Sequence, residues 1–151
     1  MDVEFAPNAN RSRGDHMPHR DVLVVDDDAA TRVLLETLLC RAGLTVQTAG
    51  NGEEAVEALA RWQVDAIIMD LFMPRMNGTD LLESFSRERQ DLLSRVIVLS
   101  AAPEALLKDA REKYPIWCAM RKPADISELM ENVLDCVVHD PAAPNRLQPQ
   151  L

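Results

Sequence analysis

Five short apolar runs, each followed by a segment with helical periodicity, constrain the fold of this chain more than any other feature. The first run, residues 22–25, is continuously apolar and β-branched, which is typical of a strand buried on both faces. The other expected strands cover residues 44–48, 66–69, 96–99 and 116–120. The expected helices cover residues 30–42, 51–62 and 103–113, and Pro103 is expected in the first turn of the third. Two more helices are expected to begin at the caps Asn77 and Asp125.

Strands that alternate with helices in this way predict βαβ units and a parallel sheet. Right-handed crossovers would bury that sheet between two layers of helices, as in a doubly wound α/β fold. In such a fold, ligands bind at the carboxyl ends of the strands. We therefore look for functional residues at those ends.

The charge balance excludes several classes of partner. Lys and Arg number 16 against 25 Asp and Glu, so the formal net charge is −9. This balance argues against a nucleic-acid partner and against docking on an anionic membrane. The sequence has neither an apolar run long enough to cross a membrane nor the apolar segment of a secretory signal. Three widely spaced cysteines, Cys40, Cys118 and Cys136, favour small buried side chains in a reducing cytoplasm.

One domain, residues 20–139, accounts for the periodic part of the chain. Residues 1–19 lack apolar periodicity and are expected to be a disordered leader. Within them, Gly14-Asp15-His16-Met17 has two open interpretations: native sequence, or a remnant of cloning with Met17 as the natural start. Residues 140–151 contain three prolines and are expected to be a disordered tail.

Polar side chains follow four of the expected strands at the point where each strand ends. They are Asp26-Asp27-Asp28, Asp70, Ser100 and Lys122. Carboxylates at one edge repel each other unless a cation neutralises them, and Mg²⁺ prefers such oxygen ligands. Asp70 could then attack phosphorus as a nucleophile, with Lys122 as a compensating cation and Ser100 as a hydrogen-bond donor to a phosphoryl oxygen.

Each of these residues alone has a structural interpretation. An Asp just after a strand is often a helix cap, and we expect Asp28 to be one. A single Lys-Pro pair is commonplace. The coincidence of all four positions at one edge of the expected sheet favours the functional interpretation.

The residues at these positions resemble the receiver domain of two-component response regulators, typified by the chemotaxis regulator. The resemblance covers residues 20–139. It implies a flavodoxin-like five-stranded sheet in the order 2-1-3-4-5. The motifs that carry it are Val22-Leu23-Val24-Val25-Asp26-Asp27-Asp28, Ile68-Met69-Asp70-Leu71-Phe72-Met73-Pro74-Arg75-Met76-Asn77-Gly78, Val96-Ile97-Val98-Leu99-Ser100-Ala101 and Lys122-Pro123.

This resemblance implies that Asp70 accepts a phosphoryl group from a phosphohistidine on a sensor histidine kinase or a histidine phosphotransfer protein. It implies that Mg²⁺ (or Mn²⁺) is held by Asp26, Asp27, Asp70 and the backbone carbonyl of Phe72. Ser100 would move to bind the phosphoryl group, and Lys122 would pair with Asp70. The Lys122–Pro123 bond is expected to be cis. The domain would then signal to a downstream protein or form a homodimer through residues 103–113, 116–120 and the last helix.

The chain departs from the family pattern at the expected switch surface. Receivers usually carry Phe or Tyr three residues before the lysine, where this chain has Ala119. Trp117 shares strand parity with Ala119, so one hypothesis is that Trp117 takes over part of the aromatic role, and the other is that it only packs or contacts a partner. Phe72 and Ala102 flank the path of an attacking water in the family, and neither can hydrogen-bond that water, which predicts slow self-dephosphorylation.

Three further alternatives stay open. A pseudo-receiver that never takes phosphate would be a constitutive interaction module, although this chain has lost neither a carboxylate nor the lysine. A phosphatase of the haloacid-dehalogenase type is disfavoured, because Ala30 stands where that chemistry needs Thr. The chain is expected to be either a stand-alone receiver or a piece of a longer hybrid protein.

Overall fold

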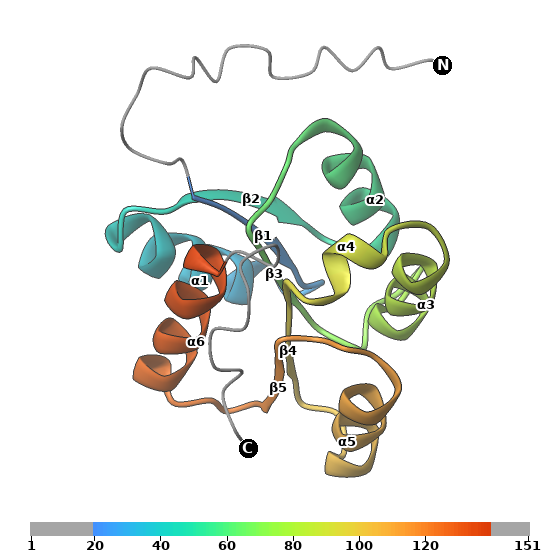
Figure 1. The fold of residues 1–151 in the computed structure, drawn as a ribbon. Helices are drawn as coiled ribbons and strands as arrows, with labels where there is room; N and C mark the ends of the chain where they lie inside the picture. The colour runs from blue at the N-terminus through green and yellow to red at the C-terminus, as the bar shows by residue number, and fades with distance from the viewer. Residues whose placement is uncertain (1–19, 140–151) are drawn as a thin grey trace.

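A computed structural model describes residues 20–139, which form a five-stranded parallel sheet flanked by helices (Figure 1). The strand order β2-β1-β3-β4-β5 is the one that the resemblance implied. The expected disordered leader, 1–19, and tail, 140–151, lie outside the described residues. The elements are β1 (Asp21–Val25), α1 (Ala29–Arg41), β2 (Thr45–Ala49), α2 (Gly52–Arg61), β3 (Ala66–Met69), α3 (Gly78–Glu88), α4 (Gln90–Leu93), β4 (Val96–Ser100), α5 (Glu104–Lys113), β5 (Cys118–Arg121) and α6 (Ile126–Val138).

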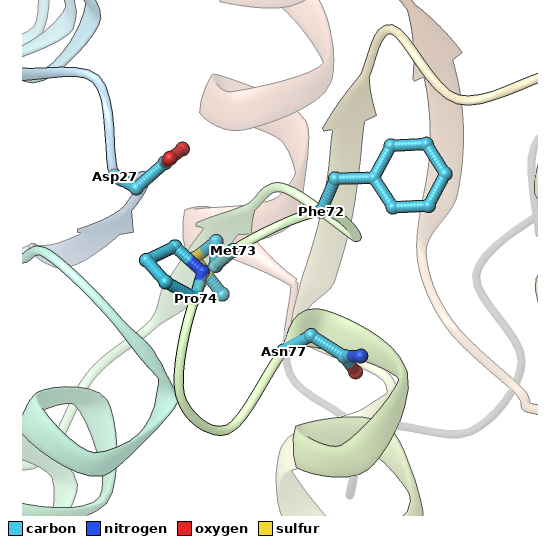
Figure 2. A pocket seen from close by; sticks show the side chains of 5 residues that line it. All are labelled: Asp27, Phe72, Met73, Pro74 and Asn77. Carbon is cyan, nitrogen blue, oxygen red and sulfur yellow. The ribbon is translucent and has the colours of Figure 1, made fainter.

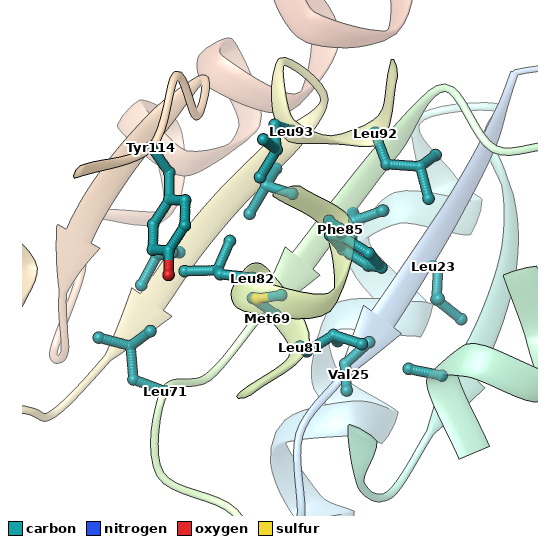
Figure 3. Packing of buried hydrophobic residues seen from close by; sticks show 14 of the residues in the cluster. Leu23, Val25, Met69, Leu71, Leu81, Leu82, Phe85, Leu92, Leu93 and Tyr114 are labelled. Carbon is teal, nitrogen blue, oxygen red and sulfur yellow. The ribbon is translucent and has the colours of Figure 1, made fainter. Parts of the chain in front are cut away.

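The sheet separates two apolar layers, as continuously apolar strands require. Successive residues of β1 point to opposite layers: Leu23 belongs to one cluster and Val24 to the other, and both are fully buried. The first cluster lies beneath α2, α3 and α5, and Figure 3 shows Phe85 of α3 packed over the strands. The second cluster lies beneath α1 and α6 (Figure 1). The doubly wound fold is therefore confirmed.

Short polar side chains begin four of the helices, because each accepts a hydrogen bond from a backbone N–H that the first helical turn leaves free. Asp28 caps α1, Asn77 caps α3 and Asp125 caps α6, as predicted. Asn51 caps α2 in the same way. Asn77 and Asp80 also form a reciprocal capping box, with Asp80 accepting from the Asn77 backbone. All four caps lie in connections that follow the carboxyl end of a strand.

Three local expectations were wrong. The short helix α4 was not predicted, and it forms because it buries Leu92 and Leu93 against the first cluster. Strand β5 begins at Cys118 and not at residue 116. Pro103 occupies the N-cap position of α5 and not its first turn. Among residues 20–139, no helix is both long and apolar enough to cross a membrane.

Candidate functional site

Strand register brings the two central carboxylates side by side. Val25 of β1 pairs with Met69 of β3, so the next residue of each strand, Asp26 and Asp70, leaves the sheet at the same edge. Ser100 ends β4 opposite Arg121 of β5. Lys122 follows directly and donates its backbone N–H to the Ser100 carbonyl at 2.9 Å. The predicted residues are therefore gathered at one edge.

The Asp70 carboxylate is surrounded by donors. Its Oδ1 accepts from the Ser100 hydroxyl at 2.6 Å and from the Phe72 backbone N–H at 3.0 Å. Its Oδ2 accepts from the Lys122 ammonium at 3.1 Å. Asp70 is only 7% exposed and Ser100 is fully buried. A buried carboxylate held this way stays in one orientation, with charge-assisted bonds on both oxygens.

Asp26 shares the same lysine. Its Oδ2 accepts from Lys122 at 2.8 Å and its Oδ1 from the Asp28 backbone N–H at 2.9 Å. Arg32 of α1 donates to the Asp26 backbone carbonyl at 2.7 Å. Arg32 was not predicted, because nothing in the periodicity of α1 indicates which polar residue reaches back over the end of β1.

Lys122 remains a cation in this setting. Burial acts to lower the pKa of its ammonium, but the hydrogen bonds that it donates to Asp26 and Asp70 and the charges of both carboxylates outweigh burial and raise the pKa above its usual value. The Lys122–Pro123 bond is cis, as predicted.

The acidic group fits a hard divalent cation. Carboxylate oxygens of Asp26, Asp27 and Asp70 lie within 4.8 Å of one another. All are oxygen donors, and Asp27 is exposed, so this side of the group is open to a hydrated ion. Three carboxylates and one ammonium leave negative charge in excess, which a divalent cation would balance.

The loop after Asp70 is held by two glycines at close approach. A Cβ on Gly78 would lie 2.7 Å from the Leu71 Cα. The Gly78 backbone N–H donates to the Leu71 carbonyl at 3.1 Å. A Cβ on Gly52 of α2 would lie 2.8 Å from the Met76 Cβ. The Gly52 backbone N–H donates to the Met76 carbonyl at 2.9 Å. Only glycine fits at either contact. The sequence pattern marked Gly78 but not Gly52.

This loop also forms most of a shallow pocket beside the carboxylates. The pocket is lined by Asp27, Phe72, Met73, Pro74 and Asn77 (Figure 2). Phe72 is 54% exposed, whereas Ala102, on the Ser100 side, is fully buried and donates its N–H to the Ser100 hydroxyl oxygen at 3.2 Å. Phe72 and Ala102, the two residues expected to flank the path of an attacking water, therefore both border the site.

The expectation that Trp117 and Ala119 share a face is wrong. Ala119 packs against the cluster beneath α5, while Trp117 packs against the opposite cluster, beside the His139 ring at a centroid distance of 5.1 Å. Strand parity fails because β5 begins only at Cys118. Trp117 and Ala119 therefore lie on opposite sides of the sheet in this structure. The Ala119 carbonyl instead accepts from Arg111 of α5 at 3.1 Å.

The chain is similar to one family along most of its length. Residues 22–134 match the model of the response regulator receiver domain. The transcriptional regulator NtrC of Escherichia coli is 37% identical over 123 residues, which are 78% of this chain and 25% of the regulator. The chain thus spans about a quarter of the length of this curated relative.

Solved structures agree with the fold. A response regulator receiver protein from Pseudomonas putida is 29% identical with a TM-score of 0.73, covering 79% of this chain and 98% of that one. The response regulator TrrA from Thermotoga maritima, solved in complex with Mg²⁺ and BeF, is 27% identical with a TM-score of 0.68, covering 78% and 98% of the two chains. An acidic pocket such as Asp26, Asp27 and Asp70 is typical of phosphoaccepting, Mg²⁺-dependent receivers.

Proposed function

Because the chain belongs to the response regulator receiver domain family, and so is a signalling phosphoacceptor and not a true enzyme, we propose that Asp70 is its phosphoacceptor. The donor would be a phosphohistidine of a sensor histidine kinase or a histidine phosphotransfer protein. The observation that carries the proposal is the position of the Asp70 carboxylate, 2.6 Å from the Ser100 hydroxyl and 3.1 Å from the Lys122 ammonium. A nucleophile, a hydroxyl donor and a cation thus meet where negative charge develops during phosphoryl transfer.

Mg²⁺, or Mn²⁺ in its place, would be held by the carboxylates of Asp26, Asp27 and Asp70 and by the Phe72 backbone carbonyl. The ion would neutralise charge between the carboxylates and the incoming phosphoryl oxygens. Lys122 orients Asp70 through Oδ2 and compensates charge on the phosphoryl group as a point cation. Ser100 donates to Asp70 before transfer, and we propose that it donates to a phosphoryl oxygen afterwards.

The output would be a change at the surface formed by α5, β5 and α6. Ser100 ends β4 four residues before α5 begins, so we propose that a shift of its hydroxyl is transmitted to that helix. Leu106 of α5 and Ile126 of α6 are exposed apolar side chains on these elements. They are available to a downstream protein or to a second copy in a homodimer. We propose that this exchange takes place in the cytoplasm and needs neither a nucleic-acid partner nor a membrane partner.

The test is an intact-mass measurement after incubation with acetyl phosphate and Mg²⁺. We expect one phosphoryl adduct that requires Mg²⁺ and is absent from the Asp70→Asn variant. Asp109→Asn, which alters an exposed carboxylate on α5, is the matched control and should be modified like the wild type. No adduct on a folded wild-type chain, with either acetyl phosphate or a phosphohistidine donor, would contradict the proposal and favour a pseudo-receiver module.

A further inference from the structure

One arginine side chain bridges the first turn of α5 and the last strand of the sheet. Arg111 lies two turns further along α5, and its Nη2 donates to the Glu104 carboxylate in the first turn. Its Nη1 donates to the Ala119 carbonyl of β5 at 3.1 Å. Strand β5 stands at the edge of the sheet, so Arg111 joins the start of this helix directly to the edge strand.

The bridge is well suited to hold its position. The Arg111 side chain is 29% exposed, and its planar guanidinium donates to two acceptors in fixed directions. A charge-assisted hydrogen bond to a carboxylate is stronger than one between neutral groups. Ala119 has no side chain beyond Cβ, at the position where receivers usually carry Phe or Tyr. Arg111 therefore contacts β5 at the residue that lacks the usual ring.

Both ends of the bridge are close in sequence to residues of the phosphoacceptor site. Glu104 comes four residues after Ser100, whose hydroxyl donates to Asp70 at 2.6 Å. Ala119 comes three residues before Lys122, whose ammonium donates to the same carboxylate at 3.1 Å. The bridge thus ties the segment that follows one site residue to the strand that precedes the other.

We propose that Arg111 is a positioning residue of the switch, which holds the start of α5 in its unphosphorylated place through Glu104 and Ala119. This inference rests on the proposed function, since it concerns the regulation of the same site. If Ser100 turns from Asp70 to a phosphoryl oxygen, the segment that leads into α5 must move with it. A bridge that anchors the far end of that segment opposes the movement.

Thermodynamic linkage sets the sign of the effect. The bridge favours the arrangement without a phosphoryl group, so it weakens phosphoryl binding, and phosphorylation weakens the bridge by the same free energy. Loss of the bridge should therefore tighten the binding of a phosphoryl mimic while it lowers the free energy of unfolding. An arginine that only stabilises the fold would lower the free energy of unfolding without tightening that binding. The opposite signs of the two changes distinguish the two roles.

The experiment titrates the full chain with beryllofluoride, a phosphoryl mimic, at saturating Mg²⁺ by isothermal calorimetry. Urea denaturation without beryllofluoride gives the free energy of unfolding of each variant. Arg111→Met removes both bonds of the bridge, Glu104→Gln weakens one of them, and the double variant combines the changes. Lys108→Met is the matched control, because it removes a cation of the same helix whose pair with Glu112 is exposed.

We expect Arg111→Met to lower the Kd for beryllofluoride by about three- to tenfold. Glu104→Gln should lower it by a smaller factor, because the bond to Ala119 remains. The double variant should match Arg111→Met, since both changes break one bridge. Lys108→Met should bind like the wild type.

Two outcomes would contradict the inference in different ways. If the wild type binds beryllofluoride and neither Arg111→Met nor Glu104→Gln binds it more tightly, the inference is wrong and the proposed function stands. Glu104→Gln alters a side chain that is 57% exposed, so it decides the question alone if Arg111→Met does not fold. If the wild type neither binds beryllofluoride nor gains a phosphoryl adduct, both the inference and the proposed function fail.

Discussion

The Tyr114 hydroxyl, at the end of α5, donates a 2.7 Å hydrogen bond to the Glu83 carboxylate of α3. This contact ties together two helices that cover the same face of the sheet, and the Tyr114 ring is itself part of the buried cluster beneath them (Figure 3). Burial and the Glu83 hydrogen bond raise the pKa of Tyr114 to about 12. The same hydrogen bond holds the pKa of Glu83 below its usual value, against the effect of desolvation.

The first prediction concerns this pair. Tyr114 is the only tyrosine, so the ultraviolet absorbance of tyrosinate reports this residue alone. We expect its pKa at about 12 in the folded chain, against about 10 when unfolded. Because the folded-state value is the higher one, the stability that Tyr114 contributes is complete below about pH 10 and is lost as the pH rises towards 12. In Glu83→Gln the pKa of Tyr114 should fall but stay above 10, since the ring is still buried. A wild-type Tyr114 that titrates at its ordinary value of 10 would contradict the hydrogen bond to Glu83.

The second prediction concerns Lys122. Lys122→Met leaves Asp26 and Asp70 without their shared cation, at side chains that are 4% and 10% exposed. Without Mg²⁺ we expect the free energy of unfolding to fall by about 2–4 kcal/mol, as for a broken buried pair, and Mg²⁺ to restore part of it. Lys108→Met is the matched control, because its pair with Glu112 is exposed, and it should cost less than about 0.5 kcal/mol. Urea denaturation measures both; equal losses would show that the site lysine is not structurally coupled to the carboxylates.

The third prediction concerns the backbone that carries the phosphoacceptor. In Gly78→Ala the added Cβ would lie 2.7 Å from the Leu71 Cα and would also meet the Asp70 carbonyl, so the backbone must shift. We expect a loss of about 2–3 kcal/mol, in the range of strained core substitutions, together with slower phosphorylation. Gly43→Ala is the control, because no atom lies near its added Cβ. Its only cost is that of an Ala at a positive φ of 87°, about 1 kcal/mol of the free energy of unfolding. A smaller loss for Gly78→Ala than for Gly43→Ala would be inconsistent with the close approach.

The fourth prediction concerns the lifetime of the phosphorylated state. Phe72 borders the site and its side chain cannot orient an attacking water by hydrogen bonding. We expect slow loss of phosphate in the wild type and several-fold faster loss in Phe72→Asn, because the amide both opens the path and can hydrogen-bond the water. The decay of the phosphoryl adduct is followed by intact mass after removal of the donor. Val56→Asn, the same change at an exposed site on α2, should decay at the wild-type rate.

The sequence was sufficient for the strand order, for three helix caps and for the residues gathered at the site, each on a different ground. The strand order followed from the family resemblance, the caps Asp28, Asn77 and Asp125 from residue type and position, and the gathering of Asp26, Asp70, Ser100 and Lys122 from the rule that parallel strands end at one edge.

The features that were missed depend on contacts between segments far apart in the chain. The face of Trp117 is set by where β5 begins, and that in turn is set by pairing with β4. Helix α4 forms because its two leucines find the core. The contact of Gly52 with Met76 joins α2 to the loop after β3, and neither segment alone indicates it.

That last contact has a mechanical consequence. The loop after Asp70 is anchored at Gly52 and again at Gly78, each time with backbone against backbone and no space for a side chain. A loop anchored at two points keeps its position when a group is added to Asp70. We therefore expect phosphorylation to move the connection from Ser100 to Pro103, which leads into α5, and not the loop after Asp70.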